Sequence, residues 1–226
     1  MTVQFCPGAQ MKRDYIKIFI LRTIGNFLLL AACSGVFLTF APAIKAEVKF
    51  RSDEFFGVKY MVVEDSTVPK GSAEQGSFLM PVSKEFGVVI PRIGANAKVV
   101  SNVDASDEGQ YLEALKNGVA HAAGTAYPGQ KGNSVLFAHS VGNFWEVNQW
   151  NAVFYLLREL EPGDEVDVFY LRKRHVYTVY DKMIVEPDQV QFLQPEADFA
   201  KLTLQTCWPP GTTFKRLLVL AKLRGG

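Results

Sequence analysis

The chain has 226 residues, enough for one ordinary domain together with a tail or an anchor. Hydrophobic residues make up 48% and charged residues 21%, a composition typical of a folded protein and not of a disordered one. The net charge of +1 gives no electrostatic reason to expect nucleic acid as a partner.

The first element in chain order is an uncharged stretch near the N-terminus. Residues 23–44 contain no charged side chain and are bracketed by Arg22 and Lys45. As a helix these 22 residues span about 33 Å, more than the roughly 30 Å of a hydrocarbon core. We therefore predict a transmembrane signal anchor at 23–44, preceded by an N-terminal tail at 1–22.

The flanking charges predict how this anchor is oriented. Basic residues outnumber acids before it, whereas bases and acids balance just after it. The positive-inside rule then places residues 1–22 in the cytoplasm and residues 45–226 outside the cell membrane. We expect an extracellular stalk at 45–84 and a folded domain at 85–226.

Two processed forms are alternatives to a retained anchor. Ala41-Pro42-Ala43 is a weak signal-peptidase site, and Leu30-Ala31-Ala32-Cys33 is similar to a lipoprotein processing box in which Cys33 would be lipidated. Both forms also place the domain outside.

The exported part contains many short apolar runs and few helical patterns. Strands are predicted at Phe86–Ile90, Lys98–Val100, Val135–Ala138, Val166–Leu171, Val176–Val185, Lys201–Cys207 and Arg216–Leu223. Helices are predicted at Asp107–Lys116 and Val147–Leu160. This pattern predicts a mostly β protein, a closed or nearly closed β-barrel of about 140 residues with a few short helices.

Cys207 is a candidate nucleophile. Cys6 is expected on the cytoplasmic side and Cys33 in the anchor, so the exported domain has one thiol and no internal disulfide. Alternation puts Cys207 on one strand face with Thr203 and Gln205, at the strand end beside a proline-rich loop. A buried packing cysteine is the alternative.

Two more side chains could complete the site. Arg216 begins the next strand, so a turn would return its guanidinium to the thiol, where it could stabilise an oxyanion. A strand-end arginine that reaches solvent is the alternative. His139 ends the apolar run Val135–Ala138. If that strand is parallel to Lys201–Cys207, the imidazole and the thiol meet at one edge.

The other two histidines are weaker candidates. We expect His175 to be solvated in the basic turn Arg172-Lys173-Arg174, and His121 to lie in a polar connecting stretch. The histidines and cysteines do not have the spacing of metal ligands, so we expect no metal site.

Several segments, in order along the chain, resemble the sortase family. Thr203–Cys207 is similar to the signature T-L-x-T-C, and Arg216 stands after it as the family's arginine does. Gly124–Asn133 resembles G-T-x-x-P-G-x-x-G-N, with His139 at the position of the family's histidine. Val89–Ile93 resembles the family's opening strand.

The sequence also departs from the family pattern. Ala138 and Ser140 flank His139 where sortases usually carry Gly and Arg. The loop between Cys207 and Arg216 is short, as in class D or class E enzymes.

The resemblance implies an eight-stranded sortase barrel that needs no cofactor, with the catalytic domain at 85–226. It implies a cysteine transpeptidase that cuts an LPxTG-type sorting motif of secreted proteins between Thr and Gly. Cys207 would form a thioacyl enzyme, His139 would act as acid and base, and Arg216 would hold the oxyanion. The acceptor would be an amine of a peptidoglycan precursor or a pilin.

Two residues are expected to bind substrate, Thr206 of the signature and Tyr127. A Tyr127 hydroxyl at the groove could accept a backbone N–H from the second motif residue, which proline lacks, and so favour LAxTG over LPxTG by about 1 kcal/mol. The alternative is that Tyr127 only caps the barrel.

Other functions also stay open. An L,D-transpeptidase is another exported cysteine enzyme of the cell wall, although its S-H-G-C type motif is absent here. A catalytically silent, membrane-anchored binding module is a possibility of a different kind, and a thiol-alkylation activity test would separate it from an enzyme.

Overall fold

The computed structural model describes residues 7–64, 76–140 and 153–225, so Cys6 lies outside the described residues. The chain divides into two compact units, Met1–Ile44 and Lys45–Gly226. Helix α1 (Pro7–Phe55) contributes to both. Within it, Asp14–Leu38 is long and apolar enough to cross a membrane. This span overlaps the anchor predicted at 23–44 but begins and ends earlier.

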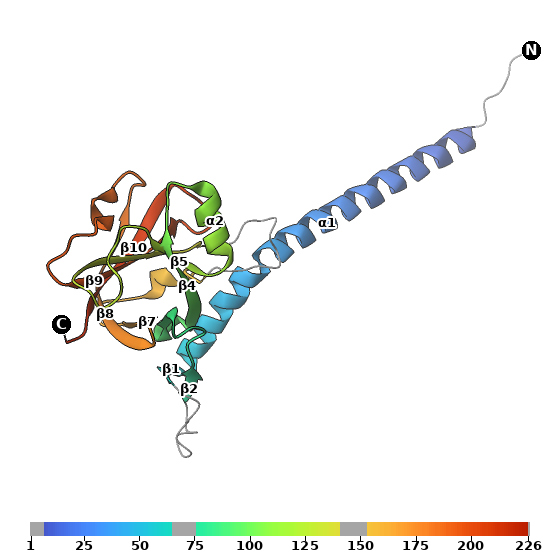
Figure 1. Cartoon of the computed structure of the whole chain (residues 1–226). Coiled ribbons are helices and arrows are strands. Elements are labelled where there is room, and N and C mark those ends of the chain that lie inside the picture. Colours follow the sequence, from blue (N-terminus) through green and yellow to red (C-terminus); the bar gives the residue numbers. More distant parts are fainter. Residues whose placement is uncertain (1–6, 65–75, 141–152, 226) are drawn as a thin grey trace, which may run out of the picture. The chain divides into compact units, whose positions relative to one another are not determined.

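The second unit contains a closed barrel of eight strands, which confirms the predicted fold class (Figure 1). The order around the barrel is β10-β8-β7-β3-β4-β5-β6-β9. Its strands are β3 (Phe86–Ile90), β4 (Ala95–Val103), β5 (Val119–Ala122), β6 (Gly132–Phe137), β7 (Glu165–Tyr170), β8 (Lys173–Val185), β9 (Ala200–Trp208) and β10 (Lys215–Leu223). Two short strands, β1 (Lys59–Val62) and β2 (Gly76–Leu79), pair in parallel as a separate sheet.

Alternation along the strands builds the barrel core. Leu202 and Leu204 of β9 and Leu217 and Val219 of β10 are buried together in the main apolar cluster. Helix α2 (Glu108–Lys116) begins where the sequence predicts, because the Asp107 carboxylate caps it by accepting a hydrogen bond from the backbone N–H of Gln110 at 3.1 Å.

The helix predicted at Val147–Leu160 is wrong over its described part. Residues 147–152 lie outside the described residues, and residues 153–156 form turns that lead into one 3₁₀ turn, η2 (Leu157–Glu159). Phe154, Leu157 and Leu160 are fully buried in the barrel core. Their spacing of three residues matches the three residues per turn of a 3₁₀ helix, and we call Phe154–Leu160 the plug.

The basic turn predicted between two strands is also wrong. The hairpin turns at Leu171 and Arg172, which both have positive φ (49° and 62°), so Lys173, Arg174 and His175 belong to β8. Arg174 then lies opposite β7, where its guanidinium donates to both carboxylate oxygens of the buried Asp167 at 2.9 and 3.2 Å.

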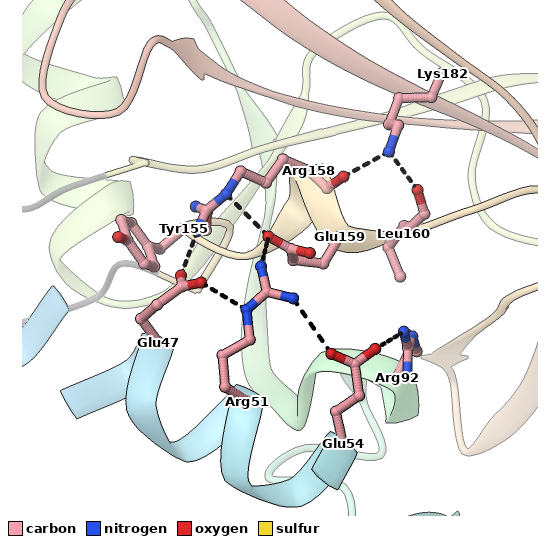
Figure 2. A network of polar contacts seen from close by, with 9 residues as sticks. All are labelled: Glu47, Arg51, Glu54, Arg92, Tyr155, Arg158, Glu159, Leu160 and Lys182. Atoms are coloured by element: carbon pink, nitrogen blue, oxygen red, sulfur yellow. Dashed lines mark hydrogen bonds and ion pairs between the residues drawn. The ribbon is translucent and has the colours of Figure 1, made fainter. Parts of the chain in front are cut away.

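The last turns of α1, expected to be part of a stalk, contact the plug and the 3₁₀ turn η1 (Pro91–Ile93) (Figure 2). Arg51 pairs with Glu159 of the plug at 3.2 Å, and Glu47 pairs with Arg158. Glu54 accepts a hydrogen bond from Arg92 at 2.9 Å. Residues 45–55 are thus tied to the barrel unit by a network of alternating charges.

Candidate active site

The pairing of β9 with β10 brings Cys207 beside Arg216. The two strands are antiparallel, and Cys207 and Arg216 are direct cross-strand partners. Such partners have Cβ atoms about 5 Å apart on the same face of the sheet. Both residues are half-buried. The backbone register therefore places the two residues side by side, and a contact between the guanidinium and the thiol stays a prediction.

The pairing of β6 with β9 brings His139 to the same edge. These strands are parallel, as the sequence argument supposed, with Phe137 opposite Gln205. The backbone N–H of Ala138 donates to the Gln205 carbonyl at 3.2 Å, so the register continues past the end of β6. Two residues further along each strand stand His139, which is half-buried, and Cys207.

Thr206 fastens these two strand ends together. Its side chain is 3% exposed, and its hydroxyl donates to the Ala138 carbonyl at 2.9 Å. Alternation turns the Thr206 side chain inward with Leu202 and Leu204, and its role in substrate binding stays a prediction. Its hydroxyl fixes the residue before Cys207 to the residue before His139.

Cys207 and Arg216 share the outer face of the barrel with an apolar cluster. Arg216 alternates with Leu218 and Leu220, which are buried together with Val185 beneath residues of the 3₁₀ turn η3 (Val190–Leu193). The Arg216 guanidinium donates to the backbone carbonyls of Thr213 at 3.0 Å and Lys215 at 3.1 Å. These two hydrogen bonds hold the Arg216 guanidinium at the start of β10.

Tyr127, the other residue expected to bind substrate, lies at the end of the barrel opposite His139. It belongs to the connection that enters β6 at Gly132, whereas His139 lies past the other end of that strand. Its ring stacks between those of His121, 4.8 Å away, and Tyr170, 5.0 Å away. This packing agrees with the capping alternative, and the preference for LAxTG stays a prediction.

His121 is a structural residue of this aromatic stack. It lies on β5, not in a polar connection, and is 1% exposed. Its Nδ1 accepts a hydrogen bond from the Asn102 N–H at 3.4 Å, and its Nε2 lies 3.1 Å from the Ala126 carbonyl, an arrangement that suits a neutral ring with Nε2–H as donor. Burial lowers the pKa of His121 below its ordinary value, despite the bond to Ala126.

His175 is not in a solvated turn but half-buried on β8. Its ring lies so close to Gly129 that a Cβ there would come within 2.2 Å of the ring. Burial, followed by the neighbouring charge of Lys173, lowers the pKa of His175. Of the three histidines, His139 is the one that the strand register brings to the edge of Cys207.

Comparisons with known proteins agree with this arrangement. A family model described as the sortase domain matches residues 88–224. Similar solved structures include a sortase D5 transpeptidase from Clostridium perfringens, 26% identical, with a TM-score of 0.51 and coverage of 62% of this chain and 79% of that one.

Two further solved structures extend the comparison. Sortase C-1 from Actinomyces oris is 27% identical, with a TM-score of 0.52 and coverage of 64% of this chain and 75% of that one. Sortase A from Corynebacterium diphtheriae is 25% identical, with a TM-score of 0.53 and coverage of 63% and 61%. The comparison with curated proteins gave no match.

Proposed function

Because the chain belongs to the sortase family of transpeptidases, we propose that it uses Cys207, His139 and Arg216 to cut an LPxTG-type sorting motif between Thr and Gly and to join the Thr to an amine. The single observation that carries this proposal is the register of three neighbouring strands. It supports the proposal because it brings the chain positions of Cys207, His139 and Arg216 to one edge of β6, β9 and β10.

In the first half of the reaction, the thiol proton of Cys207 passes to His139 and the sulfur attacks the Thr carbonyl carbon. The carbonyl electron pair moves to oxygen, where Arg216 stabilises the negative charge. The intermediate then collapses, the C–N bond breaks, and the glycine amine leaves with a proton from His139. The product is a thioester on Cys207 and a released C-terminal fragment.

In the second half, an amine attacks the thioester carbonyl and gives its proton to His139. The C–S bond breaks, which restores Cys207 and leaves the Thr carbonyl in a new amide. The amine would come from a peptidoglycan precursor or a pilin lysine. Membership of the sortase family removes the L,D-transpeptidase alternative.

The place of this reaction is inferred from α1. Its apolar span at Asp14–Leu38 and the excess of basic residues before the uncharged stretch support a single-pass protein with a cytoplasmic N-terminus and an extracellular barrel. Sorting signals of secreted proteins would reach the site on that side of the membrane.

The class of sortase is left open by the comparisons. The similar structures carry the names of sortases A, C and D, so they do not single out class D or class E. With Tyr127 at the far end of the barrel, LPxTG and LAxTG peptides are equal candidates for the test.

The test uses the full chain in detergent micelles with a panel of sorting peptides and an added amine. Mass spectrometry should detect cleavage between Thr and Gly and an amide of the new amine. Cys207→Ala should abolish both products while the thermal unfolding temperature stays close to that of the wild type. Cleavage that survives in Cys207→Ala would refute the proposed nucleophile, and a wild-type chain that processes no peptide would favour the silent binding module.

A further inference from the structure

A buried carboxamide joins β6 to the connection between β8 and β9, residues 186–199, which we call the covering loop. The Asn133 side chain is 0% exposed, and its Nδ2 donates to the carbonyls of Phe192 at 3.2 Å and Gln194 at 3.0 Å. Its Oδ1 accepts a hydrogen bond from the Thr203 hydroxyl at 2.8 Å. Both amide protons are thus used on the covering loop, and Thr203 fixes which way the amide faces.

Backbone contacts next to this carboxamide hold the rest of the covering loop. The Asn133 N–H donates to the Pro195 carbonyl at 2.8 Å, and the Gly132 N–H donates to the Phe199 carbonyl at 3.1 Å. Gly132 has a φ of 119°, and a Cβ there would lie 2.9 Å from the Pro195 carbonyl oxygen. Glycine at this position therefore permits the close approach of the covering loop, and Asn133 secures it.

The covering loop in turn builds the surface next to the candidate active site. Phe192 and Leu193 pack on Leu218 and Leu220 of β10. Leu218 is two residues from Arg216 on the same strand face, so η3 forms a wall on the face of β10 that also carries Arg216. A peptide that reaches Cys207 over the outer face of β9 and β10 would meet this wall.

Asn133 itself is too far away to touch the reacting atoms. It precedes His139 by six residues, about 20 Å along an extended strand. Thr203 precedes Cys207 by four residues, about 13 Å along its strand. Any effect of Asn133 on the reaction must therefore pass through the covering loop.

We propose that Asn133 is a positioning residue that fixes the covering loop as a preformed wall for the sorting peptide. This inference rests on the proposed function. A wall held in its binding conformation before the peptide arrives avoids the entropy cost of ordering the loop on binding. Loss of the carboxamide should therefore weaken peptide binding more than it slows the chemistry at Cys207.

The experiment compares Asn133→Ala with the wild type in the full chain in detergent, with the peptide that the wild type cleaves best. We expect KM to rise about tenfold or more, because two hydrogen bonds to the covering loop are lost, and kcat to change by less than about threefold. The alkylation rate of Cys207 by iodoacetamide should stay the same. Hydrogen exchange of the backbone amides of residues 190–194 should accelerate selectively.

Two variants keep the test decisive if Asn133→Ala folds poorly. Asn133→Leu keeps the branched shape of the side chain but has no donor, so it should behave as Asn133→Ala does. Thr203→Val keeps both donors and removes only the hydroxyl that orients them, so its rise in KM should be smaller. Asn117→Ala is the matched control, since that side chain also donates to a backbone carbonyl, Glu113 at 2.9 Å, but at the end of α2.

The outcomes separate this inference from the proposed function. Hydrogen exchange needs no sorting peptide, so unchanged exchange at residues 190–194 in both Asn133 variants overturns the anchoring role even if no peptide is cleaved. Faster exchange with an unchanged KM overturns the role in substrate binding. If kcat and the alkylation rate fall as much as KM rises, the variant has lost its fold in general, and this result would also overturn the positioning role of Asn133.

Discussion

Replacing Thr206 with Val removes one hydroxyl and leaves the shape of the side chain almost unchanged. The lost hydrogen bond joins the buried Thr206 to the Ala138 carbonyl at 2.9 Å, between the strands that carry Cys207 and His139. A buried carbonyl left without a donor costs about 1–3 kcal/mol. For a unit of this size we expect the unfolding temperature to fall by about 2–4 °C per kcal/mol.

The larger expected effect is on the reaction. A shift of about 1 Å between reacting groups can cost about 100-fold in rate, so kcat/KM for peptide cleavage should fall about 10- to 100-fold in Thr206→Val. Thr206→Ser keeps the hydroxyl and should retain most of the activity. The assay is steady-state cleavage of a sorting peptide, with the unfolding temperature measured on the same samples.

Thr125→Val is the matched control for Thr206→Val. The Thr125 hydroxyl also donates to a backbone carbonyl, that of Ala122 at 2.7 Å, but at the end of the barrel far from Cys207. We expect a comparable loss of stability with near-normal kcat/KM. Equal activity losses in Thr125→Val and Thr206→Val, or normal activity in Thr206→Val, would refute the idea that this bond aligns the two strand ends.

The remaining predictions concern the charged and titrating groups. His139→Ala should lower kcat/KM by about 100-fold or more, whereas His175→Ala should keep most of the activity; the reverse order would reject His139 as acid and base. Arg216→Lys should lose at least about tenfold in kcat/KM, because an ammonium does not reproduce the guanidinium fork, and near-normal kinetics would mean a purely structural strand-end charge. Burial lowers the pKa of His121 from 6.5, so the unfolded chain binds its proton more readily and stability should fall as the pH drops below about 6.5. His121→Gln should flatten this dependence of the unfolding temperature on pH, and an unchanged slope would contradict the assignment.

The barrel strands were predictable because their apolar residues repeat with a period of two. Phe86–Ile90 is a strand with the bounds that the sequence predicts. Strand β9 is one residue longer than predicted at each end, and β10 is one residue longer at its start. Strand β5 was missed because it is only four residues long and carries His121 among small residues. The turn at Leu171 and Arg172 was missed because it has no Gly, Asn or Asp, the residues that usually mark positive φ.

The positions of Cys207 and His139 were predictable because both residues lie at the carboxyl ends of apolar strands. A thiol and an imidazole at the carboxyl ends of two apolar runs meet if the runs are parallel, and β6 and β9 are parallel. Tyr127 and Thr206 were assigned from their place in motifs, which says nothing of the side-chain direction. The sequence shows Asn133 as the last residue of the glycine-rich motif but does not predict its role, because its partners in the covering loop are about 60 residues away in sequence.

The charge network on the last turns of α1 has a consequence for how the chain is processed in the cell. Signal-peptidase cleavage after Ala43 or lipidation at Cys33 would each cut the chain before Glu47, the first residue of that network. The charge network between α1 and the plug would therefore be the same in a cleaved enzyme, a lipoprotein and an anchored enzyme. Maturation would change where the barrel works and not how it is held together. A protease cut just after Phe55, by contrast, would separate Arg51 from the backbone that carries Glu159 and leave only non-covalent contacts to hold the helix.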